Sequence, residues 1–213
     1  MENLREWHKE RMMERTVKAL LSNYFDAHFF TDRTSLLESI MYHVYPGMTI
    51  GIGGSLSIRG LGLLENLAQI DVEVLDHWKQ GLTKEDIDVI RLAQLTCDLF
   101  LSSANAITEK GDIVNIDGSG NRVNAMTFGP KKVIIIAGYN KITPDISSAL
   151  DRIKRIAAPL NAKRLNMPLP CAETGYCHDC KVEARICRIT SIIQRRPIGT
   201  NISVYLINEE LGL

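Results

Sequence analysis

Four of the five cysteines lie close together in the last quarter of the chain, at Cys171, Cys177, Cys180 and Cys187. Four thiolates form the ligand set of a structural zinc ion or of an iron–sulfur cluster, so the residue type and number indicate a metal site. Two residues separate Cys177 from Cys180, which is the spacing that holds one ion from a turn. The sequence therefore predicts a metal-binding set made of these four cysteines.

The position of the fourth cysteine leaves three alternatives open. We predict a helix over residues 181–195, and the positions from Cys180 to Cys187 then span roughly 10 Å along its axis. The spacing also differs from the cysteine run of bacterial ferredoxins. An iron–sulfur cluster and a metal-free group of reduced or disulfide-capable thiols are equally compatible with it. Zinc is the third alternative, and His178 could replace one thiolate.

A second candidate site is the glycine-rich loop GIGGSLSIRG, residues 51–60, between an apolar segment and a predicted helix. Glycines let the backbone approach a ligand closely, while loop amides and the hydroxyls of Ser55 and Ser57 can bind a phosphate or a carboxylate. The loop matches neither the dinucleotide-binding fingerprint nor the nucleotide phosphate loop, which excludes a standard nucleotide site. A tight strand-to-helix connection capped by serine is the alternative interpretation.

Short apolar segments that alternate with amphipathic segments must position these two candidate sites. Strands are predicted at 27–30, 48–52, 72–75, 99–102, 132–137 and 202–207, and helices at 4–22, 33–45, 58–66, 84–96 and 144–157. This alternation is typical of an α/β fold with a mostly parallel sheet flanked by helices. Turn residues within 106–125 predict an inserted β-hairpin, and the prolines of 159–170 predict a break before the cysteine loop. We expect one domain over 1–213, with 159–196 as a cysteine-containing C-terminal extension.

The amino-acid composition argues against nucleic acid and a membrane as binding partners. The 25 Lys and Arg residues balance the 25 Asp and Glu residues, so no broad basic surface is expected for nucleic acid. No apolar run approaches the roughly 20 residues of a membrane span, and the charged N-terminal segment does not resemble a secretory signal. We therefore expect a cytoplasmic protein with reduced thiols that binds a small anionic organic ligand, with homo-oligomerisation as a further expectation.

Three segments, residues 51–65, 102–142 and 185–197, resemble the lactate-utilisation (LUD) domain family. The middle segment is the most specific, because a strand, an acidic hairpin, the pair Asn121-Arg122 and a second strand follow one another in it. The resemblance implies a fold similar to the ribose-5-phosphate isomerase and CoA-transferase group, with a ligand site at the glycine loop and neighbouring strand ends. It also implies a role beside lactate oxidation, where some members accompany iron–sulfur subunits, so a redox subunit is an expected partner.

The resemblance carries over to individual positions. The ligand-binding residues expected from it and from the loop chemistry are Gly51, Gly53, Gly54, Ser55, Ser57, Asn105, Thr108, Asp117 and Gly118. Glu109 lies in a region similar to that of the nucleophilic glutamate of CoA-transferases, and is the candidate catalytic base or nucleophile. Its EKG context differs from the ENG-type signature of those enzymes, and a solvated hairpin glutamate is the alternative.

Two functional hypotheses follow. The first is a LUD-type protein that assists oxidation or utilisation of lactate or a related organic acid, with the acid at the glycine loop and an iron–sulfur cluster at the cysteines. The second is a non-catalytic ligand-binding or regulatory subunit that senses an organic acid or an acyl-CoA.

Overall fold

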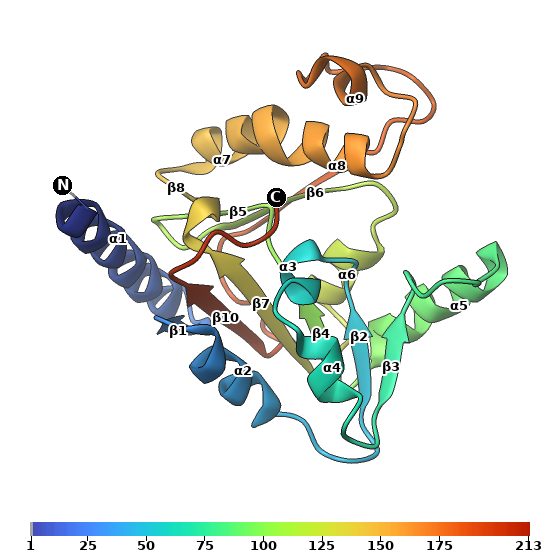
Figure 1. The fold of residues 1–213 in the computed structure, drawn as a ribbon, viewed down its shortest axis with the longest axis horizontal. Helices are drawn as coiled ribbons and strands as arrows, with labels where there is room; N and C mark the ends of the chain where they lie inside the picture. The colour runs from blue at the N-terminus through green and yellow to red at the C-terminus, as the bar shows by residue number, and fades with distance from the viewer. Residues whose placement is uncertain (1) are drawn as a thin grey trace.

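A six-stranded parallel sheet forms the centre of the protein (Figure 1). The computed structural model describes residues 2–213. The strands, in spatial order, are β1 (Asp26–Phe30), β10 (Ile202–Ile207), β7 (Lys132–Gly138), β4 (Leu99–Ser102), β2 (Thr49–Ile52) and β3 (Glu73–Asp76). All neighbouring strands of this sheet run parallel. The predicted α/β class with a mostly parallel sheet is confirmed.

Apolar side chains cover both faces of this sheet, as expected for parallel strands. Successive residues of a strand point to opposite faces, and Ile134 and Ile135 of β7 accordingly belong to two different core clusters. Helices lie on both sides: α1 (Glu2–Ser22), α5 (Lys84–Ala93) and α6 (Asn121–Thr127) contribute to the first cluster, and α2 (Arg33–Met41), α3 (Leu56–Arg59) and α4 (Leu63–Leu67) to the second. A capping box between Thr83 and Asp86 begins α5, as their spacing predicts.

A second, four-stranded sheet lies beside the first. Its order is β8 (Ile142–Thr143), β5 (Ala106–Thr108), β6 (Ile113–Asp117) and β9 (Ile189–Ile193). β5 and β6 pair antiparallel and form the predicted hairpin. Figure 1 shows α7 (Ile146–Arg152) and α8 (Ala158–Arg164) lying across this sheet, with α9 (Pro170–Thr174) beyond them.

The helix predicted over residues 181–195 is wrong. Residues 181–188 form turns and irregular backbone, and β9 follows, paired antiparallel with β6 from Ile113↔Ile193 to Asp117↔Ile189. The segment Ile-Thr-Ser-Ile-Ile is rich in β-branched residues, which favour a strand wherever a neighbouring strand offers a partner. The separation expected between Cys180 and Cys187 depended on that helix. Because the helix does not form, that separation no longer argues against Cys187 as a partner of the other cysteines.

The break predicted within residues 159–170 begins later than expected. Helical backbone runs from α7 through the π-helical turn η3 (Ile153–Ala157) into α8, so that Pro159 lies inside it. The N–H of Ala158 donates to the carbonyl of Ile153, five residues earlier. This wider turn accommodates Pro159, whose ring would clash with the preceding turn of a regular α-helix. No helix within residues 2–213 is long and apolar enough to cross a membrane.

Candidate functional site

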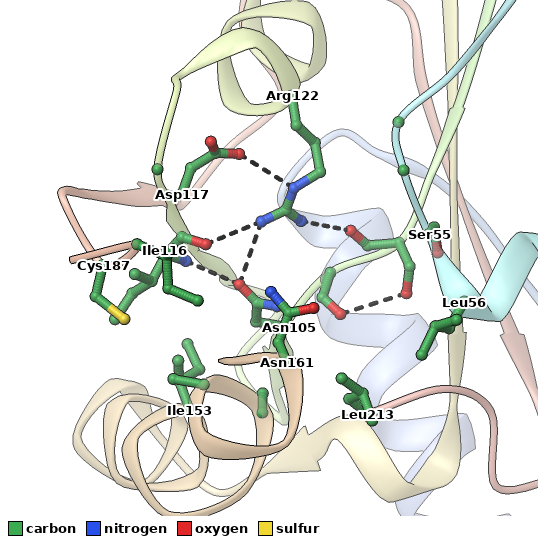
Figure 2. Close-up of a pocket in the computed structure, with 18 of the residues that line it drawn as sticks. Ser55, Leu56, Asn105, Ile116, Asp117, Arg122, Ile153, Asn161, Cys187 and Leu213 are labelled. Carbon is green, nitrogen blue, oxygen red and sulfur yellow. Dashed lines mark hydrogen bonds and ion pairs between the residues drawn. The ribbon is translucent and has the colours of Figure 1, made fainter. Parts of the chain in front are cut away.

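A cavity of about 260 Å³ lies at the carboxyl ends of β2, β4 and β7 (Figure 2). These three strands are neighbours in the parallel sheet, and ligands of α/β proteins commonly bind at such strand ends. The opposite wall comes from the end of β6, the helical segment 153–165, and the segment that carries Ile186 and Cys187. The site therefore joins the glycine loop to the second sheet and to the cysteine loop.

Lys141, three residues beyond the end of β7, contributes an amino group to the cavity lining. The residue is only 4% exposed, and its Nζ donates to Ser57 Oγ and to Ser103 Oγ, each at 2.9 Å. Burial, together with the charges of Arg152 and Arg122, lowers the pKa of Lys141 to about 7. No carboxylate within residues 2–213 contributes to this pKa, so the amino group has no counter-ion there.

Both serine hydroxyls are oriented to receive hydrogen bonds from Lys141. Ser57 Oγ donates to the carbonyl of Leu211 at 3.2 Å, and Ser103 Oγ donates to the carbonyl of Ala104 at 3.3 Å. Because each hydroxyl proton is used in this way, each oxygen accepts from Nζ with a lone pair. Gly212 approaches the same group so closely that a Cβ there would lie 2.5 Å from Ser57 Oγ.

Arg122 at the start of α6 is a second, partly buried cation at the site. Its five N–H groups donate to the Asp117 carboxylate, the Asn105 and Asn115 side chains, and the carbonyls of Ser103 and Ile116. Figure 2 shows Arg122 with Asp117, Asn105 and Ile116. Burial lowers the pKa of Arg122, and the Asp117 carboxylate opposes that shift. Since every donor of the guanidinium is already used, Arg122 fixes the strand ends and contributes charge to the cavity.

The glycine loop requires glycine at two of its lining positions. A Cβ at Gly53 would lie 2.8 Å from Ser102 Oγ. Gly54 has φ +62°, and a Cβ there would lie 3.0 Å from the indole of Trp78. The guanidinium of Arg164, which lines the cavity, lies 4.5 Å from the centre of a Trp78 ring. Arg59 instead pairs with the Asp76 carboxylate at 2.6 Å, so it does not line the cavity.

Most of the predicted ligand-binding residues come together here. The members that line the cavity are Gly53, Gly54, Ser55, Ser57, Asn105, Asp117 and Gly118. Gly51 lies within β2, where Phe100 and Cys97 leave no room for a side chain. Thr108 is buried in the hairpin and donates to the Asp112 carboxylate at 2.7 Å.

Glu109, the candidate catalytic residue, lies outside the cavity. It follows β5 in the hairpin turn and accepts hydrogen bonds from Arg15 of α1 at 2.9 and 3.2 Å. The open end of the hairpin, with Asn105 and Asp117, faces the cavity, so its turn lies at the far end of both strands. The hairpin thus presents its other end to this cavity, and the catalytic role of Glu109 stays a prediction.

The four clustered cysteines lie near one another without forming a metal-ligand arrangement. All are free, Cys171 and Cys180 share a small apolar cluster, and Cys187 lines the cavity. Burial raises the pKa of Cys187. The charge of Arg185 opposes this shift, and the other three clustered thiols add smaller increases. Within residues 2–213, no three His, Cys, Asp or Glu side chains are placed to hold a metal ion. Thiolates are donors that suit zinc or an iron–sulfur cluster, but the positions of these side chains do not.

Sequence reasoning missed Lys141, Ser103, Arg122, Asn161 and Arg164, all of which line the cavity. Ser103 directly follows β4, and Lys141 follows β7 by three residues. Both positions are polar residues just beyond apolar strands, which is a signal the sequence does contain. Asn161 and Arg164 lie on α8, where a proline-containing break was expected, so no comparable signal marks them.

Comparisons with known proteins agree with this architecture. A family model described as the LUD domain matches residues 13–207. A duf162 family protein from Deinococcus radiodurans is similar in structure over 93% of this chain and 98% of its own, with a TM-score of 0.54 and 11% identity. No curated protein matches the chain.

Two further solved structures are more distant. Ribose 5-phosphate isomerase from Plasmodium falciparum has a TM-score of 0.35 and 17% identity, over 53% of this chain and 52% of its own. For eIF2B beta from Chaetomium thermophilum the TM-score is 0.37 and the identity 14%, over 55% of this chain and 44% of its own. Both scores are too low to support any conclusion about this chain.

Proposed function

The chain belongs to the LUD domain family, which is associated with lactate utilisation, and we propose that it assists the use of lactate or a related small organic acid by binding that acid beside Lys141. The observation that carries this proposal is the buried amino group of Lys141 in the cavity lining, without a carboxylate partner. A buried ammonium is strongly destabilising unless an anion accompanies it. A bound carboxylate supplies that anion.

The size and charge of the cavity support a small acid as the ligand. A volume of about 260 Å³ lies below the range typical of drug-sized ligands. Three cationic side chains line it, those of Lys141, Arg122 and Arg164, against one side-chain carboxylate, that of Asp117. The lining therefore carries an excess of positive charge, which favours an anion over a neutral ligand.

Oxidation of lactate to pyruvate removes a pair of electrons, so assistance to that reaction calls for an electron acceptor. We propose that a separate redox subunit accepts these electrons, because within residues 2–213 the four clustered cysteines are not placed as a ligand set. Iron and sulfide measured in anaerobically purified protein test this assignment. Iron-free protein agrees with it, whereas stoichiometric iron and sulfide would show that the chain itself carries a cluster.

A non-catalytic binding or regulatory subunit is the second candidate function, and one observation favours it. Glu109 lies outside the cavity, and the Asp117 carboxylate is engaged by Arg122 and by the backbone N–H groups of Ser119 and Gly120. Within residues 2–213, no side-chain carboxylate of the lining is thus left free to act as a general base. The protein would then sense the acid and act through a partner.

Binding itself is tested by calorimetry and thermal unfolding with lactate, pyruvate and acetate. We expect saturable binding to the wild-type protein and a rise in the melting temperature, since a ligand of the folded state stabilises it. Lys141→Met should abolish both effects. Lys132→Met is the matched control, because Lys132 begins the same strand β7 and lies outside the cavity. Equal binding by the two variants would rule out Lys141 as the anchor.

A further inference from the structure

The hydrogen bonds of Lys141 leave one direction of its amino group unused. Ser57 and Ser103 each accept one hydrogen bond from Lys141. The hydroxyl of each serine in turn donates a hydrogen bond to a backbone carbonyl. A neutral amine has two N–H groups and one lone pair. Both N–H groups are therefore held by the serines, and the lone pair is left free for the cavity that Lys141 lines.

The surroundings of Lys141 favour the neutral amine over the ammonium. The residue is 4% exposed, and the charges that act on it are those of two arginines, Arg152 and Arg122. Arg152 donates to the carbonyl of Asn140 at 2.8 Å, immediately before Lys141, and so fixes the backbone that carries the amine. Desolvation and neighbouring cations together are the means by which proteins make a lysine nucleophilic at neutral pH.

The cavity also offers polar groups for a carboxylate next to the reacting carbon. Ser55 Oγ accepts from the N–H of Ile58, which leaves its hydroxyl proton to donate. Asn161 accepts from Arg164 through Oδ1, and its Nδ2 has no acceptor within residues 2–213. Figure 2 shows Ser55 and Asn161 on different walls of the cavity. Together with the charge of Arg164, these donors suit a carboxylate held beside the amine.

We propose that Lys141 is a nucleophile that condenses with the carbonyl group of a 2-oxo acid to form an imine. This proposal rests on the proposed function, because it places the same class of small acid in the same cavity. The amine lone pair attacks the carbonyl carbon, the C=O bond is replaced by C=N, and the oxygen leaves as water with the two amine protons. A 2-hydroxy acid such as lactate has no carbonyl carbon beside its carboxylate and binds without this bond.

Reductive trapping tests the imine directly. Wild-type protein is incubated with pyruvate and sodium borohydride, whose hydride converts an imine to a stable secondary amine. Peptide mass spectrometry should then find one adduct, on Lys141, with the mass of pyruvate less one oxygen atom. We expect several-fold more adduct at Lys141 than at Lys132, because burial lowers the pKa of both amines but only Lys141 lines the cavity.

Two variants serve as controls. Lys141→Arg keeps a positive charge and cannot form the adduct, whereas Lys132→Arg should trap at Lys141 as the wild type does. Absence of adduct from the Lys141 peptide, or equal labelling of Lys132, would overturn the proposal. Calorimetry with lactate separates this failure from failure of the proposed function. Lactate binding without trapping removes only the imine, whereas loss of both removes the binding site as well.

Discussion

The Nζ of Lys141 lies 2.9 Å from the Oγ of Ser57, although 84 positions separate the two residues in the chain. This contact joins the end of β7 to the glycine loop after β2, across the intervening strand β4. It places a desolvated amino group at the junction of three strand ends. The free energy of unfolding should therefore respond to the protonation of this one group.

Stability should rise with pH above neutrality because of Lys141. Its pKa in the folded protein is about 7, below the usual value of 10.5. Between these two values the unfolded chain holds a proton that the folded chain has released, so the free energy of unfolding increases with pH. From pH 6 to pH 9 the contribution is on the order of 2–3 kcal/mol, at about 1.4 kcal/mol for each unit above the folded pKa.

Urea denaturation of wild type and of Lys141→Met at these two pH values measures this contribution as the difference between the variants. Other groups titrate in both proteins and cancel in that difference. Lys141→Met should show no such rise, and it should exceed the wild type in stability at the lower pH. The same rise in both proteins would place the titration elsewhere.

Binding of lactate should weaken as pH rises through neutrality. In the proposed complex the carboxylate pairs with the ammonium form of Lys141, which the free protein loses above pH about 7. The affinity should then fall about tenfold for each further pH unit, until binding no longer depends on the proton. Calorimetry between about pH 6 and pH 8.5 measures the slope. Trapping of pyruvate requires the neutral amine and should increase over the same range, so opposite slopes are expected for the two acids.

Gly54→Ala should impair both stability and binding. Gly54 has φ +62°, where a Cβ costs about 1–2 kcal/mol, and that Cβ would also contact Trp78 at 3.0 Å. Displacement of Trp78 would shift Arg164, which lies on its ring and lines the cavity. Gly47→Ala is the matched control, since Gly47 has φ +84° with nothing within 4 Å of the added carbon.

Urea denaturation and calorimetry with lactate compare the two glycine variants. The Gly47 variant should lose about 1 kcal/mol and retain its affinity. Equal loss of stability and unchanged affinity in both variants would show that the contact between Gly54 and Trp78 does not shape the site.

Asp117→Asn should destabilise the protein by about 3 kcal/mol, because it leaves the partly buried Arg122 without its counter-ion. The Arg122 side chain is 16% exposed and the Asp117 side chain 8%, and their Nε and Oδ2 atoms lie 3.2 Å apart. Asp151→Asn provides the comparison, since its pair with Arg155 is exposed and contributes little to stability. Guanidinium denaturation of both variants measures the two losses. Similar losses would mean that solvent or another group balances the charge of Arg122 once the Asp117 carboxylate is removed.

Bound acid should slow the alkylation of Cys187. Cys187 lines the cavity, whereas Cys177 lies in the cysteine loop outside it. Iodoacetamide labelling, followed by peptide mass spectrometry, should show protection of Cys187 by pyruvate and an unchanged rate at Cys177. Cys97 should remain unlabelled throughout, because burial raises its pKa to about 11. Equal protection of Cys177 would indicate a general change of conformation.

The central sheet could be predicted because its strands carry their own signal. β7 and β10 are short, nearly continuous apolar runs, which in an α/β chain are typical of parallel strands covered on both faces. The segment of β9 carries charged residues on both sides, and a helical pattern fitted it equally well. Only pairing with β6, a long-range contact, determines its conformation.

Part of the candidate site could also be predicted, because two of its segments carry local sequence signals. Turn residues mark the glycine loop and the hairpin in the sequence. Seven of the nine predicted ligand-binding residues line the cavity. Which end of the hairpin faces the cavity depends on how the second sheet lies against the first, and the sequence of the hairpin alone does not show that Glu109 lies at the far end. Lys141 acquires its role from strand order, since β4 must lie between β2 and β7 for Ser57 and Ser103 to reach it.

The π-helical turn at Ile153–Ala157 sets the rotational register of everything that follows it in α8. A π-turn amounts to one extra residue in a helix, and each residue of an α-helix turns the chain by about 100°. Deleting one residue from this turn would leave the helix almost equally long, yet would rotate Asn161 and Arg164 off the cavity wall. One inserted residue thus determines which face of α8 the ligand meets, and a change of specificity in this fold needs no substitution among the residues that touch the ligand.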